Sequence, residues 1–414
     1  MSSHSSQVAD YQKSYTPSKH AATLCLHGPP SSKVASGPLV PAIVQSTTYV
    51  QKGVNCCDGP TYSRVANPTV DELERRLGAL EGALPSVCFG TGLAAETALF
   101  LALLKAGDHA VVGEAIYGGT VRLFREVLAP LGVSCTFVDS TDINEVRSAI
   151  TPATKLIFVE TPANPTLALT DIRAIAAIAR QANLTYIVDN TFQTPVLQRP
   201  LDLGADVTVY STTKHIDGHS AALGGAITSK DAALIDRIRW VRKCTGAIQA
   251  PFNSWITLQG LKTLPLRMER QSKHALTIAR WLETHQHIEK VFYPGLESFP
   301  QYELACSQHL GGHGGVISFE VVGGIEAGKQ LLTNVRTCRL VEHVGSVETL
   351  ITHPASMTHA DVPRSQRERV GLTDGLVRLS VGLEDPSEII DDLEQALQVA
   401  TASTSQGGVA CLTQ

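Results

Sequence analysis

A carboxylate, two hydroxyls and a lysine follow two successive apolar, β-branched runs in the middle of the chain. The first run ends in Asp189, and the second is followed by Ser211, Thr213 and Lys214. Ligands of α/β sheets bind at the carboxyl ends of the strands, so these side chains are expected to share one site. A lysine forms a Schiff base with a carbonyl group, an acid keeps a pyridinium nitrogen protonated, and hydroxyls hold a phosphate. The combination predicts a site for pyridoxal phosphate.

A glycine-rich turn at residues 90–95, with the sequence GTGLAA, supplies another part of that site. It follows an apolar run and opens a helix, and the N–H groups at a helix start bind phosphate. The turn also fits the dinucleotide pattern G-x-G-x-x-A, with Glu114 about where an acid meets a ribose. An NAD-type dehydrogenase therefore stays open as an alternative, although it leaves Lys214 and Asp189 unexplained.

Two further motifs are discounted from their context. Tyr210 and Lys214 have the Tyr-x-x-x-Lys spacing of some dehydrogenases. They would share a helical face only on a helix, whereas Tyr210 ends a β-type run. Residues 218–222, GHSAA, lack the closing glycine of a G-x-S-x-G nucleophile elbow.

The elements that must position these residues alternate between strands and helices. Residues 67–69 cap a helix that continues to Leu80. Short apolar runs predict strands at 86–89, 109–112, 134–138, 155–159, 185–188 and 206–210, and helical patterns lie at 93–104, 121–131 and 172–182. Buried strands alternating with helices predict an α/β fold with a mostly parallel sheet covered on both faces.

The remaining chain predicts a second, smaller α+β domain. Its expected strands are 316–321, 339–343 and 376–381, and its expected helices are 325–332 and 388–399. Helical patterns at 232–243 and from 254 to about 284 precede it. We therefore divide the chain into an N-terminal arm (1–60), a large domain (61–253), a connecting helix (254–288), a C-terminal domain (289–402) and a tail (403–414).

Composition excludes several classes of protein. The 414 residues are 43% hydrophobic and carry a formal net charge of −5, without the basic clusters of a nucleic-acid binder. No apolar run is long enough for a membrane segment, and there is no signal peptide. Nine scattered cysteines lack the spacing of a zinc site, which predicts no metal and indicates reduced thiols in a cytoplasmic protein.

Six ordered motifs resemble the trans-sulfuration, or Cys/Met metabolism, family of pyridoxal-phosphate enzymes. The similarity extends from about residue 22 to 399. The motifs are YSRVANPT (62–69), YGGT (117–120), ETPANPT (160–166), VDNTF (188–192), STTK with GHS (211–214 and 218–220) and RLSVG (378–382). The family includes cystathionine γ-synthases, cystathionine γ- and β-lyases, methionine γ-lyases and homoserine-ester sulfhydrylases. The resemblance implies the type I (aspartate-aminotransferase-like) fold.

The resemblance also implies roles for individual residues. Lys214 is expected to form the Schiff base and to shuttle protons, Asp189 to pair with the pyridine nitrogen, and Tyr117 to stack on the ring as an acid/base. Arg378, assisted by Asn164, is expected to bind the α-carboxylate of an amino-acid substrate. The expected phosphate ligands are Gly92, Leu93, Ser211 and Thr213, joined by Tyr62 and Arg64 from a neighbouring subunit. Borrowed residues imply a dimer, and the family usually builds a dimer of dimers.

Two positions depart from the family pattern and bear on the reaction. His343 stands where the family usually has a serine of the carboxylate pocket, so we expect either an altered substrate contact or a structural role. Gly119 stands where methionine γ-lyases carry a cysteine, which disfavours that activity. We expect γ-replacement on an O-acyl-homoserine by cysteine or sulfide, with γ-elimination of cystathionine as the alternative.

Overall fold

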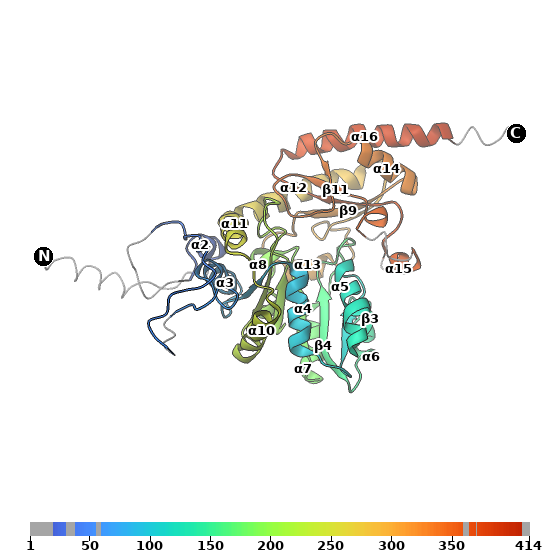
Figure 1. Ribbon diagram of the computed structural model, residues 1–414. Helices are drawn as coiled ribbons and strands as arrows, with labels where there is room; N and C mark the ends of the chain where they lie inside the picture. The colour runs from blue at the N-terminus through green and yellow to red at the C-terminus, as the bar shows by residue number, and fades with distance from the viewer. Residues whose placement is uncertain (1–19, 30–37, 55–58, 359–363, 370, 408–414) are drawn as a thin grey trace.

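A computed structural model describes residues 20–29, 38–54, 59–358, 364–369 and 371–407 of the chain. Parts of the expected arm and tail, residues 1–19, 30–37, 55–58 and 408–414, lie outside the described residues. Figure 1 shows a large sheet flanked by helices, a second sheet with its own helices beside it, and an N-terminal segment that projects to one side. The α/β expectation with a mostly parallel sheet is confirmed.

The large sheet has seven strands in the order β1-β7-β6-β5-β4-β2-β3. The strands are β1 (Val87–Phe89), β2 (His109–Gly113), β3 (Ser134–Val138), β4 (Thr154–Glu160), β5 (Thr185–Asp189), β6 (Val207–Tyr210) and β7 (Gly225–Ser229). From β6 to β3 all neighbours are parallel, whereas β7 runs antiparallel to both β6 and β1. Six of these strands match the predicted ones, and β7 was not predicted.

Both faces of this sheet are covered by helices, which explains why its central strands are mostly apolar. One face packs on α4 (Gly92–Leu103), on the helical segment Leu123–Leu128 and on α10 (Ala232–Thr245). The other packs on α6 (Ile143–Ser148) and α7 (Ile172–Gln181). Neighbouring residues of β4 alternate between these two cores, as the two-residue period of a strand requires.

Three short helices also lie in the large domain. These are α5 (Gly118–Arg122), α8 (Thr194–Leu197) and α9 (Pro200–Leu203). The predicted helix 121–131 is divided among α5, a π-helical segment and a 3-10 turn at Ala129–Leu131. Pro130 sits in that last turn, and a proline cannot donate a backbone hydrogen bond inside a helix.

The predicted long connecting helix consists of two helices. They are α11 (Pro251–Leu261) and α12 (Leu264–Thr284), separated by Lys262 and Thr263. Pro265 lies at the start of α12, where its missing N–H is not needed. The apolar period continues through the break, and this made the two helices look like one in the sequence.

The second sheet has five strands in the order β10-β11-β12-β9-β8. Its strands are β8 (Ile288–Phe292), β9 (Val316–Val321), β10 (Arg339–Leu340), β11 (Leu350–Thr352) and β12 (Leu376–Ser380). The helices around it are α13 (Tyr302–Gln308), α14 (Gly324–Asn334), α15 (Arg364–Arg369) and α16 (Pro386–Gly407). One core joins α12, α14 and α16 to this sheet. Helix α16 reaches Gly407, into the segment expected as a tail.

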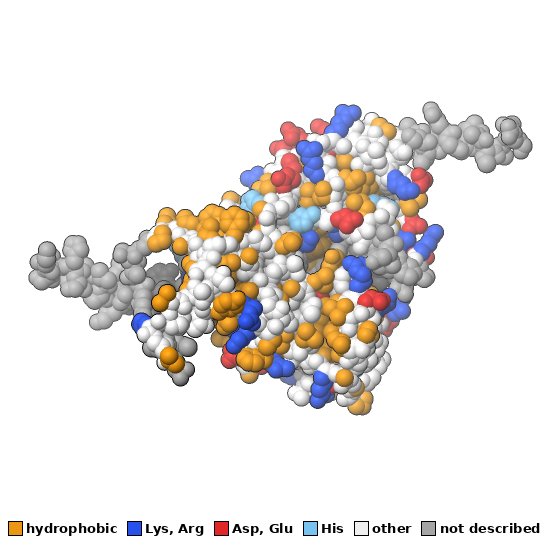
Figure 2. Space-filling view, viewed as in Figure 1, with side chains coloured by type: hydrophobic (Ala, Val, Ile, Leu, Met, Phe, Trp, Pro, Cys, Tyr) orange, Lys and Arg blue, Asp and Glu red, His pale blue; other side chains and the backbone are white. Residues whose placement is uncertain are grey.

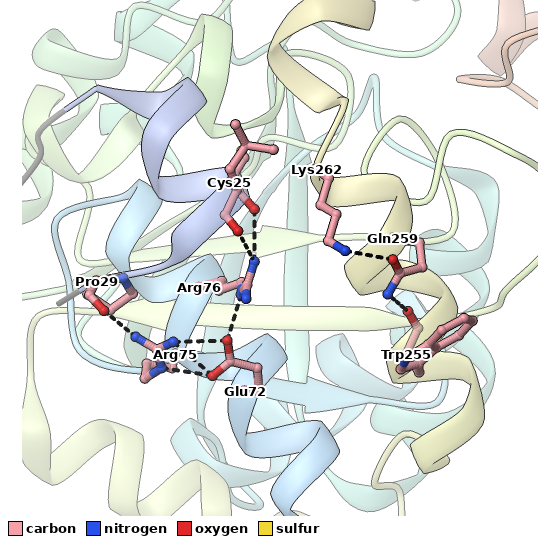
Figure 3. A network of polar contacts seen from close by, with 9 residues as sticks. Cys25, Pro29, Glu72, Arg75, Arg76, Trp255, Gln259 and Lys262 are labelled. Carbon is pink, nitrogen blue, oxygen red and sulfur yellow. Dashed lines mark hydrogen bonds and ion pairs between the residues drawn. The ribbon is translucent and has the colours of Figure 1, made fainter. Parts of the chain in front are cut away.

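The N-terminal segment is anchored through α2 (Ala21–His27) on α3 (Pro68–Leu80). Arg76 donates to the backbone carbonyls of Cys25 and Leu26 at 3.1 and 2.8 Å and pairs with Glu72. Arg75 of the same helix donates to the Pro29 carbonyl. Figure 3 shows how these contacts converge on α3. They fix one end of the arm.

In the described part of the chain, no helix combines the length and apolar character that crossing a membrane requires. Within the same residues, no three metal-ligating side chains gather into a site for an ion.

Candidate active site

A cavity of about 650 Å³ lies at the carboxyl ends of β4, β5 and β6 and is also lined by residues of the second domain. The register of the strands aligns Glu160 with Asp189, and Asp189 with Val209, so the residues that follow each strand converge. Ten of the residues expected in a site line this cavity: Gly92, Leu93, Tyr117, Asn164, Asp189, Ser211, Thr213, Lys214, His343 and Arg378. Its volume is typical of small-molecule sites.

Lys214 sits in a turn beyond β6, not on a helix, so it shares no helical face with Tyr210. Its Nζ atom lies 3.2 Å from Nδ1 of His343. Burial, together with the nearby Arg378 charge, lowers the pKa of Lys214 from 10.5 to about 8. A lysine with this pKa is neutral in a useful fraction of molecules near neutral pH, as a nucleophile or a general base requires.

Asp189 is the last residue of β5 and is buried. Burial raises its pKa to about 6, although it accepts a hydrogen bond from the N–H of Thr191 at 2.9 Å. A cationic partner would restore the ionised carboxylate. The position and the chemistry therefore fit a protonated pyridine nitrogen.

Two further buried acids line the cavity, and neither was singled out in the sequence. Glu160 accepts the backbone N–H groups of Tyr117 at 2.8 Å and Asn164 at 3.1 Å, which fixes both residues. Glu96 accepts from the hydroxyl of Thr120 at 2.7 Å, and burial with the Asp189 charge raises its pKa to about 8. Burial and Asp189 also raise the pKa of Glu160. The position of Glu160 at the end of a strand was a usable signal, whereas Glu96 lies inside an unremarkable helix.

The start of α4 forms an anion-binding corner of the cavity. Thr91 caps this helix with its side chain at the Ala94 N–H, 3.0 Å away, which leaves the first N–H groups, those of Gly92 and Leu93, without helical partners. A Cβ atom at Gly92 would lie 3.0 Å from Cβ of Ser211, so glycine brings the helix close to that strand end. The hydroxyl of Thr213 is paired with the backbone of Gly224 at 3.0 and 3.1 Å.

Arg378 reaches the cavity from the middle of β12 and is 3% exposed. Its guanidinium donates to Oδ1 of Asn164 at 2.7 Å and to the His343 carbonyl at 3.3 Å. Burial lowers the pKa of Arg378 to about 10, so it remains a cation at neutral pH. A permanent planar cation held by an amide is suited to binding a carboxylate.

Tyr117 is 42% exposed at the start of α5, where its ring borders the cavity. A Cβ atom at Gly119 would lie 2.4 Å from Cε1 of this ring. Any side chain at position 119 therefore requires the tyrosine ring to move. Glycine at this position permits the observed orientation of Tyr117.

Tyr62 and Arg64 are not among the residues that line the cavity of their own chain. The guanidinium of Arg64 lies 5.3 Å from the Tyr62 ring centroid and donates to the Lys243 carbonyl at 2.7 Å. The ring of Tyr62 is 39% exposed. A single chain thus leaves these two expected phosphate ligands outside its site.

The residues behind the dehydrogenase alternative have other partners. Glu114 forms an ion pair with Arg369 at 3.0 Å. Tyr210 is buried, donates to Glu81 and accepts from Asn190 at 3.1 Å. Neither side chain lines the cavity.

The family model described as Cys/Met metabolism PLP-dependent enzyme matches residues 22–398. The chain belongs to this family. A cystathionine β-lyase of Coxiella burnetii is 42% identical over 380 residues, which cover 91% of this chain and 98% of that protein. A cystathionine γ-lyase of Bacillus subtilis is 42% identical over 376 residues, covering 91% and 98%. The structure of a Lactobacillus plantarum cystathionine γ-lyase complexed with L-serine has a TM-score of 0.89 at 38% identity, covering 92% and 99%.

The protein is therefore a trans-sulfuration enzyme of the type I fold that uses pyridoxal 5′-phosphate, and the dehydrogenase alternative has no support. The cavity fits this cofactor because an amine, a buried acid and a helix N-terminus line the same space. Lys214 would hold the aldehyde carbon, Asp189 the ring nitrogen, and the start of α4 the phosphate. When bound, the cofactor supplies an electron sink for charge that develops on the substrate carbons.

Proposed function

We propose that this enzyme is a cystathionine γ-lyase, which releases cysteine, 2-oxobutanoate and ammonia by γ-elimination. The sequence led us to expect γ-replacement first. The relatives above are named lyases and are matched over almost their full length, which favours elimination. The proposal rests on one observation of the site, the position of an amine of lowered pKa beside a carboxylate clamp.

The clamp consists of Arg378 and Asn164, and it orients the substrate by its α-carboxylate. Lys214 lines the same cavity as this clamp, so a substrate held there would share that space with the lysine amine. With a pKa of about 8, Lys214 both accepts and returns protons near neutral pH. Elimination at the γ-carbon needs such a group, because protons must leave and re-enter neighbouring carbons.

Gly119 argues against methionine as the main substrate. The Tyr117 ring occupies the space that a Cβ at position 119 would need. The methionine γ-lyases carry a cysteine at this position. A cysteine here would require the Tyr117 ring to lie elsewhere. We infer that this arrangement serves the longer thioether of cystathionine, which also presents a second amino-acid group.

Product analysis tests the proposal. The purified enzyme with pyridoxal phosphate is given cystathionine in one tube and O-acetyl- or O-succinylhomoserine with cysteine or sulfide in another. We expect cysteine and 2-oxobutanoate from the first tube. Homocysteine and pyruvate in the first tube would assign β-elimination instead, and cystathionine or homocysteine formed only in the second would restore γ-replacement.

We also propose that the working unit is at least a dimer in which Tyr62 and Arg64 complete the partner's phosphate site. The N-terminal arm directly before them has strongly exposed apolar side chains, including Leu39 at 96% and Val50 at 102%. Figure 2 shows further hydrophobic side chains gathered over α11, where Phe252 is 51% exposed. Exposed apolar surface of this kind is typical of a subunit interface.

A further inference from the structure

The carboxylate clamp is assembled from both domains. Arg378 belongs to β12 of the second sheet, whereas Asn164 belongs to the loop 161–171 that follows β4 of the large sheet. The 2.7 Å hydrogen bond between them therefore depends on how this loop is held against the second domain. A clamp of two groups binds a carboxylate well only when both stay in the right place relative to each other.

The loop is closed by its own hydrogen bonds and holds one leucine in an unfavourable conformation. The Thr170 N–H donates to the Thr161 hydroxyl at 3.1 Å, and the Ala163 N–H donates to the Ala168 carbonyl at 2.9 Å. Leu167 has a φ of +59°, in the left-handed region that side chains other than glycine rarely adopt. Such a conformation persists only where the surroundings hold the backbone in place.

Two neighbouring residues of the second sheet hold two neighbouring residues of the loop. Ser318 on β9 is the register partner of Arg378 on β12, so the two side chains point to the same face of the sheet. Arg378 donates to the Asn164 side chain, and the Ser318 hydroxyl donates to the Pro165 carbonyl at 2.5 Å. Ser318 is fully buried. Its hydroxyl thus fixes the backbone directly after the residue that Arg378 contacts.

A second contact fixes the far end of the loop. Gln301 immediately precedes α13 in the second domain. Its amide accepts the Leu169 N–H at 2.7 Å and donates to the Leu169 carbonyl at 2.5 Å, as a neighbouring strand would. The Leu169 side chain is fully buried and belongs to the same core as Tyr293 and Ile317. A residue from the large domain is thereby part of the core of the second domain.

We propose that Ser318 and Gln301 are positioning residues for substrate binding, because they fasten the loop of Asn164 to the domain that carries Arg378. In the described part of the chain, neither of the two lines the cavity, so they act through Asn164 and not on the ligand. They keep the amide at the guanidinium before a ligand arrives, which lowers the cost of ordering the clamp. The inference rests on the proposed role of Arg378 and Asn164 at the α-carboxylate, and it holds for elimination and replacement alike.

The test separates binding of the carboxylate from the rest of binding by comparing two ligands. L-Norvaline carries an α-carboxylate, and n-butylamine is the same molecule with hydrogen in place of that carboxylate. Neither has a leaving group on its β- or γ-carbon, so neither is consumed by elimination or replacement. The full-length enzyme loaded with pyridoxal phosphate is titrated with each ligand, and binding is followed by the visible absorbance of the bound cofactor.

The variants are Ser318→Ala, Gln301→Met, Asn164→Ala and the double variant that combines Ser318→Ala with Asn164→Ala. Ser229→Ala is the matched control, because Ser229 is a buried serine of β7 whose hydroxyl donates to the Asp206 carbonyl at 2.8 Å. Circular dichroism and cofactor content check that each variant is folded and loaded. These measurements make carboxylate recognition visible without turnover.

We expect Ser318→Ala and Gln301→Met each to weaken L-norvaline binding about 3- to 10-fold, the effect of a lost hydrogen bond, and to change n-butylamine binding by less than about 2-fold. Ser229→Ala should leave the binding of both ligands unchanged. Asn164→Ala removes the group that is positioned, so adding Ser318→Ala to it should weaken L-norvaline binding no further.

Three results would overturn the inference. They are equal losses of affinity for both ligands, wild-type affinity for L-norvaline in both single variants, and a full loss from Ser318→Ala in the Asn164→Ala background. An Asn164→Ala enzyme with wild-type affinity for L-norvaline would refute the clamp together with this inference. The products formed from cystathionine are unaffected by any of these outcomes, so failure of this inference is distinguishable from failure of the proposed reaction.

Discussion

Replacing Lys214 by methionine should make the cofactor-free protein more stable at neutral pH while abolishing covalent cofactor binding. The reason is that the site buries a lysine whose pKa is about 8 instead of 10.5. The pKa of Lys214 is lower in the folded protein than in the unfolded chain, so a protonated Lys214 destabilises the folded state. The free-energy cost is complete below pH 8 and disappears as the pH rises past 10.5.

The size of the cost follows from the two pKa values. Linkage gives a destabilisation of about 3 kcal/mol at pH 7, about 2 kcal/mol at pH 9 and under about 1 kcal/mol at pH 10.5. Methionine has a similar length and carries no charge. It also loses the hydrogen bond to His343, which is worth about 1–2 kcal/mol. The expected net gain at pH 7 is about 1–2 kcal/mol, and it should shrink by about 1 kcal/mol at pH 9.

Urea unfolding of the cofactor-free proteins at equal concentration measures this difference at pH 7 and pH 9. Lys155→Met is the matched control, because Lys155 is an exposed residue of β4 in the same domain. Its substitution should change the free energy of unfolding by less than about 0.5 kcal/mol. A Lys214→Met protein that is less stable than wild type at pH 7, or whose gain does not fall with pH, would refute the reasoning.

Three more substitutions probe the remaining parts of the structure. Arg378→Lys should raise KM for cystathionine about 10- to 100-fold with a smaller effect on kcat, because an ammonium group cannot bind both Asn164 and the substrate carboxylate. Steady-state kinetics measure both constants, and a fall in kcat instead of a rise in KM would contradict this. Arg64→Ala and Lys214→Ala should each be inactive alone. Mixed dimers of the two co-expressed variants should regain activity, because one of their two sites combines a native Lys214 with a native Arg64 from the partner. Inactive mixed dimers would contradict a site shared between subunits. Glu74→Gln should cost about 3 kcal/mol or more in urea unfolding, since it removes the partner of the fully buried Arg242; an unchanged midpoint would contradict this.

The sequence predicted the large sheet well because its strands are buried on both faces. A short continuous apolar run therefore predicts a buried strand of a parallel sheet. The polar residue at the end of the run marks the edge of the sheet where ligands bind. Asp189 and Lys214 were found in this way. The strand β7 was missed because its GAITS sequence starts with glycine next to Gly224 and resembles a turn. Its strand character depends on pairing with β1 and β6, which no local pattern reveals.

The contact between Lys214 and His343 could not be derived from the sequence. The two residues are 129 positions apart, and they lie in loops that follow strands of different sheets. Their distance depends on where β10 ends and on the close approach of Gly345 to His215. Glu96 was missed for a similar reason: a single acid on a helix otherwise apolar at its start is normally solvated. Only the tertiary structure places it beside Asp189.

Four ionisable groups of the cavity share one physical property, since burial moves the pKa of each in the direction that favours its neutral form. The pKa values of Asp189 and Glu96 are raised to about 6 and 8, while those of Lys214 and His343 are lowered to about 8 and 4. A cofactor with a phosphate and a ring nitrogen brings the opposite charges that these groups lack. Binding thus stabilises the charged forms that burial disfavours. The same desolvation that makes Lys214 reactive therefore destabilises the cofactor-free fold. The two effects change in opposite directions with pH, because the neutral fraction of Lys214 rises as the pH increases while the destabilisation falls toward zero past pH 10.5.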